Sequence, residues 1–202
     1  KGCVIESMKN MLFIMNPKAG RTTLKNSLVD VLEVFCNNDY AVRTYLTKSA
    51  DDAERIVQEE GANYDVIVCA GGDGTLGNTV TGYMKSGIRV PLGYIPCGST
   101  NDFARSMDIP RETVEAAEMI VKAEPFSIDI GSLNDKNFVY VAAFGMFSDT
   151  SYATPQNMKN IFGHAAYVLQ GIKSLANVPS YKMKVTIDGD EQEGEFIFGM
   201  VS

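Results

Sequence analysis

The first 125 residues alternate between short apolar runs and amphipathic segments, and polar loops follow the apolar runs. Runs this rich in Val, Ile, Leu and Met are typical of strands buried inside a parallel sheet. We predict strands over residues 11–17, 40–46, 65–70 and 90–96, and helices over about 24–35 and 110–123. Ser49, with Asp52 three residues later, resembles a capping box that opens a further helix running to about residue 60. Strands that alternate with helices predict a doubly wound α/β layer, in which ligands bind beyond the carboxyl ends of the strands.

The pattern changes after residue 125, where strand-like segments are no longer separated by regular helices. We predict strands over 127–134, 137–144, 181–187 and 194–201, with one helix from about 156 to 175. Consecutive strands of this kind indicate an antiparallel, β-rich second domain. The predicted domains are therefore 8–125 and 126–202. Because the last strand reaches the end of the chain, we expect the second domain to be incomplete and the chain to be a fragment.

Composition excludes several classes of function. The 202 residues include 18 basic and 25 acidic side chains, a net charge of −7, which does not favour general nucleic-acid binding. There is no run of roughly 18 apolar residues that would predict a membrane-spanning helix. The 4 cysteines are scattered and accompanied by 1 histidine, so neither a disulfide framework nor a zinc site is expected. Unpaired cysteines are typical of the reducing cytosol, so we expect a cytoplasmic location.

Three polar loops follow three of the predicted strands, at residues 16–21, 71–75 and 98–102. Carboxyl ends of parallel strands lie on one edge of the sheet, so we expect the loops to converge. Glycine lets backbone N–H groups approach a phosphate closely, and a helix that begins directly afterwards adds a favourable dipole. Lys18 and Arg21 add positive charge. These features predict a phosphate-binding site.

Two aspartates, Asp73 and Asp102, stand in these loops although a carboxylate repels a bare phosphate. A magnesium ion between carboxylate and phosphate would reverse that repulsion, so the loops favour a magnesium nucleotide. A purely structural alternative remains open, in which Asp73 is a turn residue and Asp102 or Ser99 caps a helix.

Residues 72–77 also fit the dinucleotide fingerprint G-x-G-x-x-G. That fingerprint belongs in the first strand–helix unit and is followed by an acidic residue about 20 positions later. Here it follows the third predicted strand, and residues 90–96 contain no acid. The match is therefore interpreted as accidental, and no Walker phosphate loop is found either.

Taken together, the motifs resemble the diacylglycerol kinase catalytic domain that bacterial lipid kinases share with sphingosine kinases. The matching segments are NPKAG at 16–20, GGDGT at 71–75, GSTNDFAR at 98–105, SIDIG at 127–131 and the stretch 154–171. GGDGT also occurs in NAD kinases and phosphofructokinases, but its combination with GSTNDFAR is far more specific.

The resemblance implies transfer of the γ-phosphoryl group of Mg-ATP to a lipid hydroxyl, with diacylglycerol as the expected acceptor. It implies nucleotide contacts from Asn16, Pro17, Lys18, Ala19, Gly20, Thr47, Gly72, Asp73, Gly74, Thr75, Leu76, Gly77, Asn78 and Ser99. It also implies a catalytic acidic network of Asp73, Asp102 and Asp129, with Asp73 and Asp102 near Mg²⁺. A lipid acceptor implies a cytoplasmic protein peripheral to the membrane, and a homodimer is left open.

This chain departs from the family pattern in two places. Gly77-Asn78 stands where the family usually has Asn-Glu, so an expected carboxylate is missing. The family also has catalytic acids in an Asp-Gly-Glu-like stretch, and the similar residues 188–191 are predicted to be a hairpin turn instead. We therefore expect the general base to lie beyond Ser202 and this fragment alone to be inactive. Two alternatives remain, an NAD kinase and a non-catalytic nucleotide-binding module.

Overall fold

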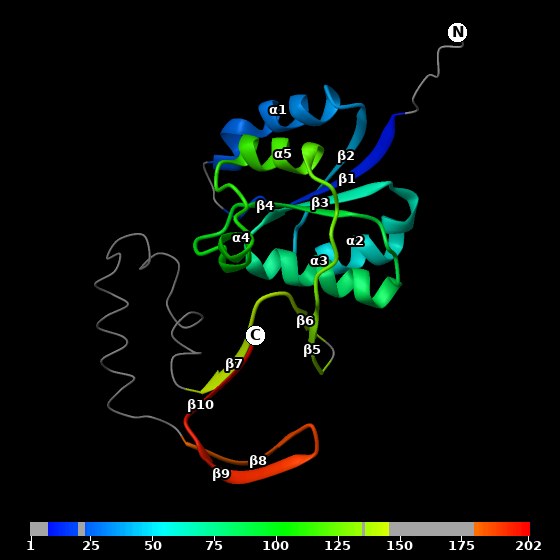
Figure 1. The fold of residues 1–202 in the computed structure, drawn as a ribbon. Helices are drawn as coiled ribbons and strands as arrows, with labels where there is room; N and C mark the ends of the chain where they lie inside the picture. Colours follow the sequence, from blue (N-terminus) through cyan, green and yellow to red (C-terminus); the bar gives the residue numbers. More distant parts are fainter. Residues whose placement is uncertain (1–7, 20–22, 135, 146–179) are drawn as a thin grey trace, which may run out of the picture. The chain divides into compact units, whose positions relative to one another are not determined.

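The computed structural model describes residues 8–19, 23–134, 136–145 and 180–202. The chain divides into two compact units, Lys1–Tyr140 and Val141–Ser202 (Figure 1). The division into a nucleotide-binding and a lipid-binding domain after residue 125 stays a prediction, because the two compact units are defined by contacts between residues and not by what they bind.

The first unit is built on a parallel four-stranded sheet in the order β2-β1-β3-β4. The strands are β1 (Lys9–Met15), β2 (Tyr40–Leu46), β3 (Val66–Gly71) and β4 (Leu92–Pro96). Figure 1 shows α1 (Thr23–Cys36) and α5 (Thr113–Lys122) on one face, with α2 (Asp52–Glu60) and α3 (Asp73–Ser86) on the other. The short elements are the 3₁₀ turn η1 (Gly61–Asn63) and α4 (Asp102–Ser106). The predicted α/β class with a mostly parallel sheet is confirmed.

Alternating side chains of the central strands form a core on each face of this sheet. Every residue of β3 is buried, which explains its continuous apolar sequence. Phe13 of β1 packs edge to face on Phe35 of α1, with ring centroids 5.6 Å apart. Its neighbours Leu12 and Ile14 point to the opposite face and pack against α2. Helices on both faces therefore hold the strand ends, and the loops that follow them, in fixed register.

The second helix begins later than the predicted capping box at Ser49 and Asp52 implies, and only half of that box is formed. Asp52 is the first residue of α2, and its carboxylate accepts hydrogen bonds from the backbone N–H groups of Lys48 (2.6 Å) and Ser49 (3.1 Å). These N–H groups lower the pKa of Asp52 to about 2. Ser49 is not the N-cap: the residue before α2 is Asp51, which makes no side-chain capping bond.

A short hairpin of β5 (Gly131–Leu133) and β6 (Lys136–Phe138) belongs to the first unit. It packs on α3, where the backbone N–H of Asn137 donates to Thr81 Oγ1 at 3.2 Å. The prediction of one strand over 127–134 was too long, because residues 124–129 lie exposed outside any strand. The predicted strand 137–144 is divided between β6 and β7.

The second unit contains two antiparallel pairs in its described part. β7 (Ala142–Gly145) pairs with β10 (Phe198–Val201), and β8 (Tyr181–Ile187) pairs with β9 (Asp190–Phe196). Asp188 and Gly189 connect β8 to β9 with φ angles of 52° and 95°, the left-handed geometry of a tight hairpin. The predicted turn is confirmed, and the predicted helix over 156–175 lies outside the described residues.

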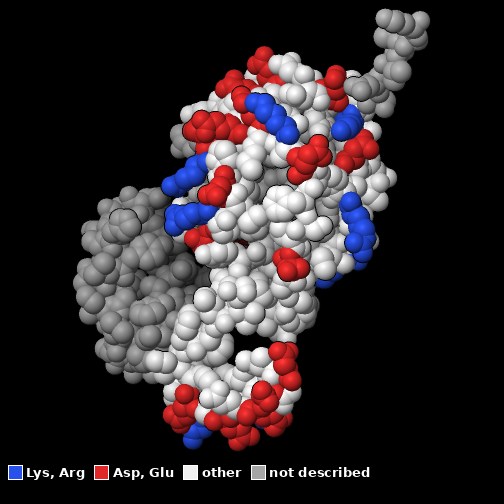
Figure 2. Space-filling model, viewed as in Figure 1, with Lys and Arg blue, Asp and Glu red and all other residues white. Residues whose placement is uncertain are grey.

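The β8–β9 hairpin is strongly acidic, and Figure 2 shows its carboxylates gathered on one surface. Lys184 pairs with Glu191 at 2.6 Å, and Lys182 pairs with Glu195 at 3.6 Å. The hairpin therefore presents no basic surface to an anionic bilayer. Among the helices that the structure describes, none is long and apolar enough to cross a membrane.

Candidate functional site

The loops that follow β1, β3 and β4 meet at the carboxyl edge of the sheet. The backbone N–H of Asn16 donates to the carbonyl of Ala70 at 2.9 Å, and its side-chain amide donates to Thr75 Oγ1 at 3.1 Å. On the other side of β3, the N–H of Cys97 donates to the carbonyl of Gly71 at 2.7 Å. In the sheet β1 lies beside β3. From β1 the chain continues to β2 on one side, and from β3 it continues to β4 on the other side. This is the position at which doubly wound sheets bind ligands.

Two glycines in these loops are required by packing. A Cβ atom at Gly98 would lie 2.6 Å from the Gly72 Cα atom and 2.6 Å from Asn101 Oδ1. A Cβ atom at Gly71 would lie 2.6 Å from Thr75 Oγ1. The loops after β3 and β4 therefore touch backbone to backbone, which no larger residue at Gly98 permits.

Gly74 differs from both, because packing does not demand a glycine there. It lies in the first turn of α3, is exposed, and a Cβ atom built on it has no heavy atom within 4 Å. The first N–H groups of a helix have no partner inside the helix. The missing side chain leaves that turn open from outside, as the backbone of a phosphate site must be.

Asp73 links the loops after β3 and β4. Its carboxylate accepts the backbone N–H groups of Asp102 at 3.2 Å and Phe103 at 3.3 Å, and Thr100 Oγ1 lies 3.4 Å from it. These are the first N–H groups of α4, so Asp73 caps this helix from a distant position in the sequence. Asn101 holds the N-cap position of α4 and makes no side-chain capping bond. Neither Asp102 nor Ser99 is therefore the N-cap of this helix. The Asp73 carboxylate thus already has a structural task.

Asn101 and Tyr94 hold the loops after β4 and β3 through hydrogen bonds to Gly98 and Gly71, and neither was predicted as a site residue. Asn101 is buried with φ 51°, and its side chain both accepts the Gly98 N–H at 2.7 Å and donates to the Gly98 carbonyl at 3.0 Å. The Tyr94 hydroxyl donates to the Gly71 carbonyl at 3.1 Å. Burial raises the pKa of Tyr94 well above its usual range, and the nearby Asp73 charge adds to this. Asparagine tolerates left-handed backbone, which was the available signal for Asn101.

The remaining predicted residues occupy different surroundings. Thr47 is 7% exposed, and its N–H donates to the Met15 carbonyl at 2.9 Å, beside the Asn16 loop. The N–H of Lys18 donates to Asn16 Oδ1 at 3.0 Å, forming a tight turn through Pro17 and Ala19 with the Lys18 side chain exposed. The Leu76 side chain is in the core, so only its backbone is available. Ser99 is exposed, and Gly20 lies outside the described residues, as does Arg21.

The acidic residues are only partly brought together. Asp73 and Asp102 are linked by the bond from the Asp102 N–H, whereas Asp129 lies in the exposed stretch between α5 and β5. In the part of the chain that the structure describes, no three His, Cys, Asp or Glu side chains are grouped closely enough to hold a metal ion. Asp73 and Asp102 offer carboxylate oxygens, the ligand type that Mg²⁺ prefers. The metal and catalytic roles of all three remain predictions.

Gly77 and Asn78, the unusual pair in α3, have defined neighbours. The Asn78 side-chain amide donates to the Ala50 carbonyl at 2.7 Å and ties α3 to the segment before α2. A Cβ atom at Gly77 would meet only the Asn137 carbonyl oxygen, at 3.9 Å. The β5–β6 hairpin therefore leaves room for a larger residue at Gly77.

Replacing Gly77 by alanine should stabilise the protein. A helix-interior glycine costs about 0.5–1 kcal/mol relative to alanine, so the Gly77→Ala variant should melt about 1–4 °C higher. Gly82 in the same helix is the matched control, because its Cβ atom would lie 2.7 Å from the Glu54 carbonyl oxygen. The melting temperature should rise for Gly77→Ala and fall for Gly82→Ala. A lower melting temperature for Gly77→Ala would show that this position needs its glycine.

Comparison with known proteins identifies the family. The sequence model of the diacylglycerol kinase catalytic domain matches residues 10–133. A diacylglycerol kinase of Bacillus subtilis (strain 168) is 35% identical over 197 residues, which cover 96% of this chain and 65% of that protein. One of Staphylococcus aureus (strain JH9) is 34% identical over 201 residues, covering 96% of this chain and 63% of that protein.

Solved structures agree with these sequence matches. A crystal structure of a diacylglycerol kinase from Bacillus anthracis str. Sterne superimposes with a TM-score of 0.76 at 28% identity, covering 95% of this chain and 63% of that one. This chain therefore spans less than two thirds of the length of these three relatives. Since the family match includes all three converging loops, the chain belongs to the diacylglycerol kinase catalytic domain family.

Proposed function

We propose that the complete protein is a lipid kinase, which transfers the γ-phosphoryl group of Mg-ATP to a lipid hydroxyl and converts diacylglycerol to phosphatidic acid. Membership of the diacylglycerol kinase family supports the reaction class. The observation that supports the nucleotide site is the open first turn of α3 at Gly74, directly beside the three converging loops. Because diacylglycerol is a membrane lipid, the proposal includes contact with a membrane surface from the cytoplasm.

In this proposal the phosphates of ATP bind over Gly72 to Thr75. The N-terminus of α3 attracts negative charge, and Lys18 adds a positive charge from the neighbouring loop. A magnesium ion near Asp73 and Asp102 would neutralise charge on the transferring phosphoryl group. Asn16 fixes the loop after β1 against Thr75, so that both loops keep their positions when phosphate binds. Asp129 is proposed as the third member of the acidic network.

A transfer assay with labelled ATP tests the proposal. The complete protein is offered diacylglycerol, other lipids with a free hydroxyl, and NAD in separate reactions with and without Mg²⁺. We expect labelled phosphatidic acid from diacylglycerol, dependent on Mg²⁺, and no labelled product from NAD. Labelled product from NAD alone would replace the proposal with the NAD kinase alternative.

One observation favours a non-catalytic nucleotide-binding module as a second candidate. The family carboxylate that usually follows GGDGT is absent, and Asn78 at this place is bonded to the Ala50 carbonyl. Calorimetry with Mg-ATP separates the two candidates. Tight binding without turnover of any lipid in the panel would support the module and contradict the kinase.

A further inference from the structure

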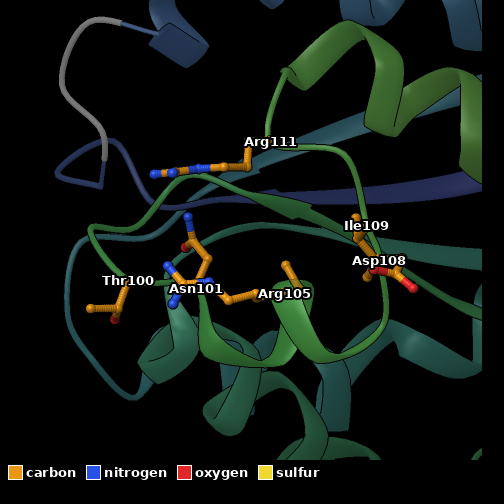
Figure 3. A pocket seen from close by; sticks show the side chains of 7 residues that line it. Thr100, Asn101, Arg105, Asp108, Ile109 and Arg111 are labelled. Carbon is orange, nitrogen blue, oxygen red and sulfur yellow. The ribbon is translucent and has the colours of Figure 1, made fainter.

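A pocket of about 250 Å³ lies beside the loop after β4, on the side of α4 and of the segment that connects α4 to α5. Two arginines, Arg105 and Arg111, contribute to its wall together with Thr100, Asn101 and Asp108. Figure 3 shows both arginine side chains extending toward the end of the pocket where Thr100 and Asn101 lie, while Asp108 is at the opposite end. The pocket therefore has a positively charged end.

Nothing in the described structure neutralises this charge. Across residues 8–19, 23–134, 136–145 and 180–202, neither arginine forms an ion pair, and Asp108 forms none with them. A guanidinium keeps its charge at every physiological pH. Both arginines are exposed residues, and two positive charges in the wall of one pocket favour an anion that contacts both. This local charge contrasts with the net charge of −7 for the chain.

The arginines are positioned by short backbone contacts. Arg105 is in α4, which the Asp73 carboxylate caps at its first N–H groups. The chain turns after α4 at Asp108, with φ 52°, and the N–H of Ile109 returns to the Ala104 carbonyl at 2.9 Å. This turn brings Arg111 back over the same pocket. The Asn101 side chain is bonded to Gly98 and the Thr100 hydroxyl is directed at Asp73, so the two guanidinium groups are the main donors left for a ligand.

Size and donor geometry narrow the class of ligand. Sites that enclose a whole organic ligand measure about 300–1,000 Å³, so this pocket suits a single compact group. Planar guanidinium groups bind carboxylate and phosphate in a two-pronged manner, and a pair of arginines matches the double charge of a phosphate monoester. Thr100 belongs both to this pocket and, through Asp73, to the candidate nucleotide site.

We propose that Arg105 and Arg111 form a second phosphate-binding site, which takes a terminal, doubly charged phosphate group carried by a nucleotide or by a lipid. If the source is a nucleotide, the site binds the proposed substrate ATP or its product ADP. If the source is a lipid, the site binds phosphatidic acid. The site needs only the pocket and its charges, so it can exist whether or not the protein transfers phosphoryl groups. Failure of the kinase proposal and failure of this one are therefore separate results.

Direct binding of inorganic phosphate to the complete protein tests the site, by calorimetry and by the rise in melting temperature with phosphate concentration. We expect affinity to fall at least about tenfold in Arg105→Gln and in Arg111→Gln, and further in the double variant. Arg89→Gln is the matched control, an exposed arginine outside the pocket, and should bind phosphate like the wild type. Arg111→Lys keeps the charge without the planar fork and should give an intermediate affinity.

Two competition experiments then identify the source. Displacement of phosphate by ADP assigns the site to the nucleotide, and displacement by vesicles containing phosphatidic acid, but not by phosphatidylcholine vesicles, assigns it to the lipid. Wild-type affinity in a folded Arg105→Gln/Arg111→Gln variant would overturn the proposal. So would an equal loss of binding in the Arg89→Gln control.

Discussion

Replacing Asp73 by alanine should abolish lipid phosphorylation by the complete protein and also weaken its fold. The carboxylate accepts the N–H groups of Asp102 and Phe103, so its removal leaves the start of α4 uncapped at a cost of about 1–2 kcal/mol. Loss of the proposed magnesium contact should lower turnover by at least about 100-fold. The two effects have different origins and can be separated.

Asp73→Asn separates charge from capping. The amide oxygen can still accept one of the two N–H groups, but the negative charge is gone. We expect most of the stability to be retained, with turnover as low as in Asp73→Ala. Asp65→Asn is the matched control, because Asp65 also accepts a backbone N–H, from Asn10 at 2.7 Å, at the opposite end of β3. Its activity should stay near that of the wild type, and near-wild-type activity in Asp73→Ala would refute the site assignment.

Alanine at Gly98 and alanine at Gly74 should have opposite effects on stability. At Gly98 the new methyl group collides with the Gly72 backbone at 2.6 Å, and such overpacking costs about 1–3 kcal/mol. At Gly74 the methyl group enters open space in a helix, so stability should hold or rise by up to about 1 kcal/mol. Yet it covers the turn that we propose binds phosphate, so Mg-ATP affinity should fall at least about tenfold in a stable protein.

Urea unfolding and calorimetry with Mg-ATP measure both properties on the same samples. Gly98→Ala should lose stability and, with the loop displaced, nucleotide binding as well. Undiminished Mg-ATP affinity in a stable Gly74→Ala protein would contradict the proposed phosphate position, because that position requires close backbone approach at the first turn of α3.

Local sequence was enough to predict most of the first unit. The strand at Tyr40–Leu46 was predicted with the bounds that the structure has, and β3 was recognised by its continuous apolar run. Prediction was weaker after residue 125. There Gly131–Leu133 forms only a three-residue strand, because its partner is a short hairpin strand packed on α3 and its sequence does not reveal that partner.

Residue patterns alone were sufficient to predict the four strands of the first unit's sheet, the helices α1, α2 and α5, the edge at which the polar loops meet, and the tight turn at Asp188 and Gly189. Hydrophobic periodicity and turn preference depend on residues that are neighbours in the chain, so the sequence alone reveals them. The folded structure was needed to find that Asp73 caps α4, that Gly72 touches Gly98, and that Arg105 and Arg111 share a pocket. Those relations join residues on different loops, and the packing of helices on both faces of the sheet sets the distances between them.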